Sequence, residues 1–231
     1  MDAKFITETN THYVFKFLFF KIKIRKKMNN KIILLLENGE EKVVKKVKGI
    51  DIKFKGDNSV VKIGCPVADF RDCTIYAGNN CQIFIDTSEY FIRNTIINAS
   101  ADNSTVKIGK DCYSFDNLEI LLHREPNLSV TIGDRCMFGT NVVIRTSDAH
   151  TITDLEGNVI NFGKNVVLKD HVWCAMNTTV LKGVTIAENS CVATGAIVSK
   201  DLPIPNSIYG GIPAKQVKTG INWDKKRLLN M

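Results

Sequence analysis

The sequence contains no uncharged apolar run close to the ~20 residues that a membrane-spanning helix needs. No small-residue cleavage site follows its early hydrophobic stretch, so we expect a cytoplasmic protein. Its seven cysteines are an odd number, and none forms the Cys-x-x-Cys pair that zinc sites usually contain. These features argue against a complete disulfide framework, favour a reducing compartment, and lead us to expect no metal.

The sequence does contain a strict six-residue period. Large apolar residues occupy every sixth position in one phase, and 12 of 14 positions are apolar. Chance would give about six, so the period indicates the hexapeptide repeats of a β-helix. Ser114 and Pro126 break the pattern. The positions are Ile108, Ser114, Ile120, Pro126, Ile132, Phe138, Ile144, Phe162, Leu168, Cys174, Val180, Ile186, Val192 and Val198.

A second inward residue is expected two positions before most of these, because alternate residues of a strand share a face. Three hexapeptides would close one triangular coil, so positions 18 apart in the chain should stack along the axis. We call this the stacking rule. The pattern therefore predicts an all-β fold of stacked coils. The second inward residues include Val106, Cys112, Leu118, Val130, Cys136, Val142, Ile160, Val166, Val172 and Val184.

The period is interrupted once, between Ile144 and Phe162, where positions 150 and 156 are polar. A polar stretch that leaves a regular stack and rejoins it in phase is typical of a protruding loop, and functional residues concentrate in such loops. His150 lies in this stretch.

We expect four segments: a basic N-terminal segment at 1–55 with a β-hairpin, irregular early coils at 56–103, the hexapeptide-repeat domain at 104–218, and a C-terminal tail at 219–231. The hairpin is predicted at Lys31–Val44, around Asn38-Gly39, because this dipeptide accepts positive φ. A short helix is predicted at Asn222–Leu229.

The net charge of +7 is concentrated in residues 1–55, which hold 14 Lys and Arg against 6 Asp and Glu. The stretch Tyr13–Lys27 mixes aromatic residues with cations. It is interpreted either as a capping element with a solvated cationic face, or as a contact with an acidic glycan or peripherally with the inner membrane. We expect no nucleic-acid partner.

The order of several motifs after residue 104 resembles the hexapeptide-repeat acyltransferases. The resemblance extends to about residue 218, and its motifs are most similar to O-acetyltransferases of bacterial surface polysaccharides, including sialic-acid polymers. The motifs are Ser147-Asp-Ala-His150, Lys169-Asp-His-Val-Trp173, Leu181-Lys-Gly-Val-Thr-Ile186, Ile197-Val-Ser-Lys200-Asp-Leu-Pro203 and Ser207-Ile-Tyr-Gly-Gly-Ile-Pro-Ala-Lys215.

The resemblance implies a left-handed parallel β-helix, acetyl-CoA as co-substrate, and a homotrimer with active sites at its subunit interfaces. The acceptor would be a carbohydrate hydroxyl of a capsular or lipopolysaccharide glycan. Such a transfer needs a group that accepts the hydroxyl proton, and imidazole titrates in the useful range. His150 is the candidate general base for direct transfer, with Asp148 or a backbone carbonyl fixing its tautomer. His171 and His123 are weaker candidates for groove-lining residues.

The pantetheine arm of coenzyme A needs small side chains along one corner, and Ala175, Ala193 and Gly211 are spaced by 18. Lys200 and Lys215 are candidates for binding the phosphates. Corner packing and solvated lysines are the alternative explanations. By the stacking rule Trp173 lies over Cys191 and Tyr209; the resemblance places Trp173 at the thioester, and trimer packing is the alternative.

Other functions stay open at this point. They are N-acetylation of a nucleotide-linked amino sugar, O-acetylation of a small molecule such as serine, a zinc hydratase that would need three convergent histidines, and a non-catalytic β-helix that binds polyanions.

Overall fold

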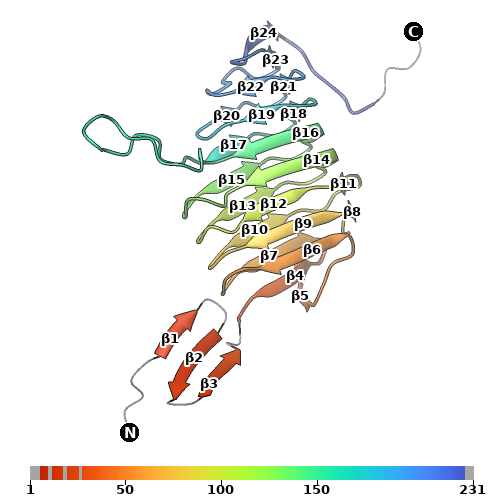
Figure 1. Ribbon diagram of the computed structural model, residues 1–231. Coiled ribbons are helices and arrows are strands. Elements are labelled where there is room, and N and C mark those ends of the chain that lie inside the picture. Colours follow the sequence, from red (N-terminus) through yellow and green to blue (C-terminus); the bar gives the residue numbers. More distant parts are fainter. Residues whose placement is uncertain (1–5, 10–11, 18–19, 26–27, 227–231) are drawn as a thin grey trace.

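The computed structural model describes residues 6–9, 12–17, 20–25 and 28–226. These residues form strands and turns, with no α-helix among them and therefore no helix able to cross a bilayer. Near the N-terminus, β1 (Ile6–Thr9), β2 (His12–Phe17) and β3 (Phe20–Arg25) form an antiparallel sheet of their own. The rest of the described chain winds into a left-handed parallel β-helix (Figure 1).

Two long sheets form walls of this helix. The first has the order β20-β17-β15-β13-β10-β7-β4-β5, and all its pairs are parallel except β4 with β5. Its strands are β4 (Lys31–Leu35), β5 (Glu41–Val44), β7 (Val60–Gly64), β10 (Gln82–Ile85), β13 (Thr105–Ile108), β15 (Ser129–Ile132), β17 (Val166–Leu168) and β20 (Thr185–Ile186).

The second long sheet has the order β24-β23-β21-β18-β16-β14-β12-β9-β6, and only the pair at one end, β23 with β24, is antiparallel. Four short strands, β8, β11, β19 and β22, pair beside it. The strands are β6 (Ile50–Phe54), β8 (Asp69–Arg71), β9 (Cys73–Ala77), β11 (Phe91–Arg93), β12 (Ile96–Ala99), β14 (Tyr113–Leu121), β16 (Met137–Arg145), β18 (Trp173–Cys174), β19 (Thr179–Val180), β21 (Cys191–Val192), β22 (Ile197–Val198), β23 (Ser207–Gly210) and β24 (Lys215–Thr219).

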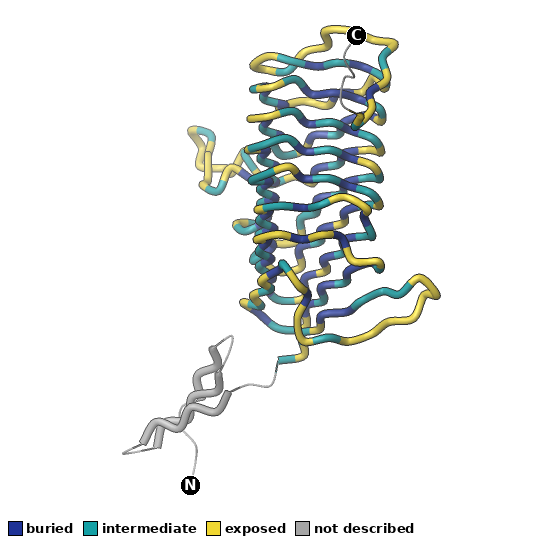
Figure 2. The backbone as a smooth tube through the Cα atoms, turned by 90° about the vertical axis from the view of Figure 1, so that its right-hand side faces the viewer, coloured by how far each residue is buried: buried dark blue, intermediate teal, exposed yellow. Residues whose placement is uncertain are grey.

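The predicted inward residues fill the centre of the helix, where buried positions recur coil after coil (Figure 2). Nearly all positions of the six-residue period are buried, including Ser114, whose hydroxyl accepts a hydrogen bond from Thr95 Oγ1 at 3.1 Å. Pro126 is exposed. The prediction was wrong for Ile160 and Phe162, which are 61% and 65% exposed because they belong to the protruding loop.

The coil length differs from the predicted three hexapeptides over half of the helix. Strand register pairs Ile83 with Val106 and Val106 with Val130, so the first of these coils is one residue short of four hexapeptides and the second has four. A coil of three hexapeptides occurs only after the loop, where Leu168 pairs with Ile186. Because coils of three and of four hexapeptides share the six-residue period, the period could not distinguish them. The parallel ladders cross residue 104 without a break.

Corners of the wider coils are made by residues with positive φ, most of them asparagines. The side-chain amides bond from coil to coil, as between Asn117 and Asn141 at 2.9 Å and between Asn141 and Asn177 at 3.1 Å. Asparagine suits these positions because it tolerates the left-handed conformation better than most residues. The row of hydrogen-bonded asparagines continues across the coil that contains the protruding loop, since Asn141 bonds to Asn177.

At each end of the helix one antiparallel strand is added to a parallel sheet, β5 at the N-terminal end and β24 at the C-terminal end. The predicted hairpin is present as β4 and β5, with Gly39 at φ +83° in the turn. At the other end the predicted helix is absent: residues 222–226 are not helical, and 227–229 lie outside the described residues. The chain after β24 turns back beside the stack (Figure 1), where the amine of Lys225 donates to the carbonyl of Asp111 at 2.6 Å.

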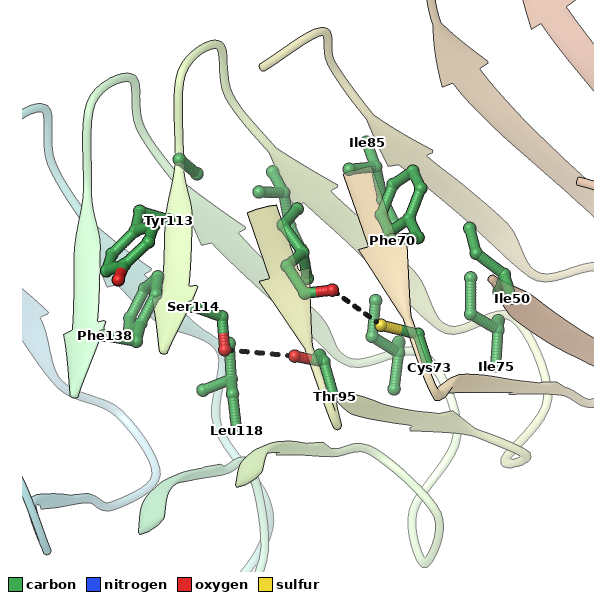
Figure 3. A pocket seen from close by; sticks show the side chains of 14 residues that line it. Ile50, Phe70, Cys73, Ile75, Ile85, Thr95, Tyr113, Ser114, Leu118 and Phe138 are labelled. Atoms are coloured by element: carbon green, nitrogen blue, oxygen red, sulfur yellow. Dashed lines mark hydrogen bonds between the residues drawn. The ribbon is translucent and has the colours of Figure 1, made fainter. Parts of the chain in front are cut away.

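The wider coils enclose a small apolar cavity (Figure 3). Its volume is about 20 Å³, and Phe70, Cys73 and Phe138 are among the side chains that line it. A space of this size holds one water at most, and its apolar walls offer a water almost no partners. The cavity is therefore a packing void of the core and not a ligand site.

All seven cysteines are free, and all but Cys65 are buried. Burial raises the pKa of Cys174 to about 12 and that of Cys191 to about 11. Because the thiolate is the nucleophile, both thiols are held in their unreactive form at neutral pH.

We therefore predict one reactive thiol in the native protein. An aromatic disulfide reagent should titrate Cys65 rapidly, the Cys65→Ser variant should show no rapid phase, and all seven thiols should react after denaturation. Rapid modification of two or more thiols in the native state would contradict the burial of the other six.

Candidate functional site

Two parallel rows of residues run along one side of the helix. Strands β8, β11, β14, β16, β18, β21 and β23 pair in succession. Each has an inward residue, and the two rows are the residues immediately before and after it. The register gives the tryptophan row as Asp69, Phe91, Tyr113, Met137, Trp173, Cys191 and Ile208. It gives the small-residue row as Arg71, Arg93, Phe115, Gly139, Ala175, Ala193 and Gly210.

The rows border two adjoining grooves that share Trp173, Ala175 and Thr194. The larger groove, of about 610 Å³, extends toward the N-terminal coils. The other, of about 430 Å³, extends toward the C-terminal coils and contains Ala193 and Trp223. The structure thus brings Trp173, Ala175 and Ala193 together, with the indole of Trp173 half-buried at the junction.

The predicted partners in the last coil are wrong by one residue. Cys191 pairs with Ile208 and Val192 with Tyr209, because the last coil is one residue shorter than three hexapeptides. Tyr209 is therefore buried below Val192, and its hydroxyl donates to the carbonyl of Ile204 at 2.9 Å. In the small-residue row Gly210 takes the place predicted for Gly211, which lies in an exposed turn at φ +97°.

The row contains one small residue that the sequence analysis missed, Gly139. A Cβ atom at Gly139 would lie 2.8 Å from the backbone nitrogen of Met176, so the coils approach too closely there for a side chain. Gly139 precedes Ala175 by twice the spacing of the stacking rule, with the loop between them. That signal was available in the sequence.

Of the two predicted phosphate-binding lysines, only Lys215 adjoins a row. It pairs with Gly210 at the start of β24. Lys200 follows β22, and it lines neither groove. Both side chains are exposed and have no acidic ion-pair partner within the part of the chain that the structure describes.

The loop that carries His150 is fastened at its base by Asn161. The side-chain amide of Asn161 donates to the Asp148 carboxylate at 3.0 Å and to the His150 carbonyl at 2.8 Å, and its oxygen accepts from the Ile152 nitrogen at 2.8 Å. Lys182 forms an ion pair with Asp148 and donates to the Asn161 carbonyl at 2.6 Å. The loop therefore leaves the stack from a hydrogen-bonded base.

The hydrogen bonds of the Asp148 carboxylate therefore come from Asn161 and Lys182 at the base of the loop and not from the imidazole of His150. The hydrogen bond from Lys182 is the main reason that the pKa of Asp148 lies below its ordinary value of 3.8. A lowered pKa means that the stabilisation is complete above that value and is lost as the pH falls further. Within the described residues, no hydrogen bond joins the imidazole of His150 to Asp148 or to a backbone carbonyl.

His150 lines a pocket of about 260 Å³ with Arg124, Glu125 and Phe162. None of the residues that line this pocket lines either groove beside Trp173. The loop protrudes on the left in Figure 1, whereas β8 and β11 lie on the right. Within one chain, therefore, the structure does not bring His150 and Trp173 together.

The other two described histidine side chains have structural surroundings. The ring of His171 stacks on Trp223 with the centroids 4.0 Å apart, and its Nδ1 lies 3.0 Å from Asn189 Oδ1. The Nδ1 of His123 is buried without a partner, and burial is the main cause that lowers its pKa. Among the described residues, no three His, Cys, Asp or Glu side chains converge as metal ligands, which leaves the zinc hydratase without a site there.

We predict that Asn161→Ala loosens the loop without unfolding the helix. The Ile152 amide loses its acceptor and the His150 carbonyl its donor, each bond being worth about 1 kcal/mol. Hydrogen exchange of residues 151–160, followed by mass spectrometry, should accelerate several-fold while that of β13–β16 stays unchanged. Asn141→Ala, which removes an amide from the corner ladder, is the matched control. Unchanged exchange in the loop would show that Asn161 does not fasten it.

Known proteins resemble the chain over most of its length. A polysialic acid O-acetyltransferase of Neisseria meningitidis is 31% identical over 165 residues, covering 66% of this chain and 76% of that protein. A galactoside O-acetyltransferase of Escherichia coli (strain K12) is 30% identical over 122 residues, covering 53% and 58%. The crystal structure of the polySia-specific acetyltransferase NeuO superimposes with a TM-score of 0.71 and 27% identity, covering 87% of this chain and 81% of that one.

These similarities have limits. No protein-family model matches the chain. Of four curated relatives, the E. coli galactoside enzyme among them, the chain spans less than two thirds of the length, between 34% and 62%.

Proposed function

Because this chain belongs to the hexapeptide-repeat O-acetyltransferases, we propose that it transfers an acetyl group from acetyl-CoA to a carbohydrate hydroxyl. The observation that carries the proposal is the row of Gly139, Ala175, Ala193 and Gly210 beside the indole of Trp173. A long, thin thioester carrier needs such a row of small side chains beside it.

The small-residue row fits the donor. Its small side chains leave room for the pantetheine arm along the coils, and Lys215 at its end provides a cation for phosphate. Lys200 remains a second candidate for the phosphates. Acetyl-CoA supplies an activated acetyl group, and Trp173 borders the groove where that group would lie.

His150 is the proposed general base. It accepts the proton of the acceptor hydroxyl while the hydroxyl oxygen bonds to the acetyl carbon, and the carbon–sulfur bond then breaks to release the thiol of coenzyme A after protonation. The developing oxyanion needs a preorganised donor. The N–H groups of Trp173 and Ala175 already donate to the carbonyls of Ser190 and Val192, so another backbone N–H group near these two residues is the candidate. The buried thiols of Cys174 and Cys191, with their high pKa values, do not suit a covalent acyl-enzyme.

The separation of His150 from Trp173 within one chain supports a site shared between subunits of a homotrimer. The protruding loop carries several exposed apolar side chains, which an isolated chain would leave in water. A second copy that covers them would place its own groove beside this His150. These side chains are Ile152, Leu155, Val159, Ile160 and Phe162.

We further propose that the acceptor belongs to a capsular or lipopolysaccharide glycan. Relatives that act on polysialic acid and on galactosides support a carbohydrate acceptor. Acetylation of a nucleotide-linked amino sugar or of serine is the alternative, and assays of polymer, nucleotide sugar and free amino acid side by side decide between them. The basic N-terminal segment is compatible with a cytoplasmic enzyme that contacts an acidic glycan or the anionic surface of the inner membrane.

A shared site predicts complementation between two inactive variants. His150→Ala should lower the transfer rate by about 10²-fold or more, because general-base catalysis is typically worth that much. Trp173→Ala should also be nearly inactive. Co-expressed as mixed oligomers, the two should recover about a quarter of the wild-type activity, since random mixing makes that share of interfaces intact.

The control for complementation is each variant mixed with itself, and sedimentation should show that both variants assemble like the wild type. Mixed oligomers without any recovered activity would contradict a site shared between subunits. Activity of His150→Ala within a few-fold of the wild type would contradict its role as base.

The donor row predicts a steric effect at Ala193. Ala193→Leu should raise the KM for acetyl-CoA at least tenfold, because the larger side chain occupies the groove. Ala193→Ser is the matched control, since it keeps a small side chain at the same position. Steady-state kinetics at saturating acceptor measure the effect, and equal KM values for the two variants would contradict the assignment of the row to the donor.

A further inference from the structure

On the N-terminal side of Trp173 the two rows change their character. The small residues end at Gly139, and the preceding coils contribute large aromatic rings and arginines in the same register. We call this surface the aromatic ledge and define it as Tyr90, Phe91, Tyr113, Phe115 and Arg93. Its four aromatic residues line the same groove of about 610 Å³ as Trp173 and Ala175.

The rings form a contiguous cluster from neighbouring coils. Phe91 lies 4.7 Å from Tyr113 and 6.3 Å from Phe115, measured between ring centroids, and Tyr90 lies 6.1 Å from Tyr113. Phe115 is 48% exposed. An exposed cluster of this kind is typical of a surface that a ligand or partner covers. Aromatic rings present flat apolar faces that suit the C–H faces of a sugar ring.

The ledge is also cationic. The guanidinium of Arg93 lies 4.7 Å from the ring centre of Phe91 and 5.7 Å from that of Phe115. Arg71 lies 5.3 Å from Phe91 but forms an ion pair with Asp69. Within the described chain, Arg93 has no carboxylate at ion-pair distance.

A guanidinium that stacks on rings keeps its N–H edge free for a planar, bidentate partner, and a carboxylate is the best match. A second cation closes the other side of the ledge. The Lys225 amine lies 3.9 Å from the Tyr90 ring centre, and its hydrogen bond goes to the carbonyl of Asp111 and not to an acid. Asp69 lies beside Phe91 in the tryptophan row, and its carboxylate already forms an ion pair with Arg71.

We propose that the aromatic ledge is the acceptor subsite and binds a carboxylated sugar residue of an acidic glycan. The sugar face stacks on Phe91 and Phe115, and its carboxylate is bound by Arg93. Because the groove continues from the ledge to Trp173, a glycan bound on the ledge directs a neighbouring hydroxyl toward the proposed donor end. The inference rests on the proposed function and adds to it the class of acceptor and the residues that select it.

The test measures binding, which requires no turnover. Oligomers of sialic acid serve as the carboxylated probe and galactosides as the neutral one, each titrated calorimetrically into the full-length protein. Arg93→Gln should weaken binding of the sialic acid oligomer at least tenfold, Arg93→Lys should restore it only in part, and Phe115→Ala should weaken it several-fold. The matched control is Lys107→Gln, an exposed cation of β13 on the other sheet, which should leave it unchanged.

The KM for acetyl-CoA should be the same in all four variants, because the ledge precedes Gly139, where the small residues proposed to hold the donor begin. The proposal is overturned if the wild type does not bind the sialic acid oligomer, if Arg93→Gln binds it as the wild type does, or if galactoside binding falls equally. It is also overturned if Arg93→Gln or Phe115→Ala dissociates the oligomer in sedimentation, since the ledge would then be a subunit interface. Normal binding through Arg93 without acetyl transfer would refute the proposed function and leave the subsite intact.

Discussion

The structure depends on the hydrogen-bonded register between successive coils. Parallel ladders fix which residue of one coil lies over which residue of the next. Because the apolar residues point inward, a slip of one residue would turn the core side chains outward, and the register is therefore strongly specified. Each wall therefore carries straight rows of side chains over many coils. The tryptophan row and the small-residue row result directly from this constraint, because residues distant in the chain become neighbours along the axis.

Much of the fold followed from the sequence because the core repeats. Residues such as Ile120, Ile132 and Val180 are buried as the six-residue period predicts, and Asn38-Gly39 makes the predicted hairpin turn. The length of the coils could not be predicted from the sequence, because a coil that is longer by one hexapeptide keeps the same six-residue period. Phe162 shows the complementary error: its position fits the period by coincidence, while its side chain lies in the loop.

The candidate site was predictable only in part. Trp173, Ala175 and Ala193 share a groove because they lie within regular coils of three hexapeptides. Gly211 was displaced by Gly210 because one coil is a residue shorter, and no periodicity shows a single deletion. The aromatic ledge could not be found by the stacking rule, since its residues belong to the wider coils. His150 and Trp173 line different pockets of one chain, and a sequence period that orders residues along the coils says nothing about where a protruding loop lies.

The segment that follows β24 has a consequence for the order in which the helix comes apart. Beyond the loop most strands shorten to two or three residues, and an end made of such short strands is where a linear stack would fray first. Trp223 stacks on His171 there, and its indole donates to the His171 carbonyl at 2.9 Å. Lys225 then bonds to Asp111, 114 positions earlier in the chain. This segment therefore ties the C-terminal coils, whose strands are short, to the coils of longer strands before the loop. Unwinding from the C-terminal end requires that the contacts of Trp223 and Lys225 break first.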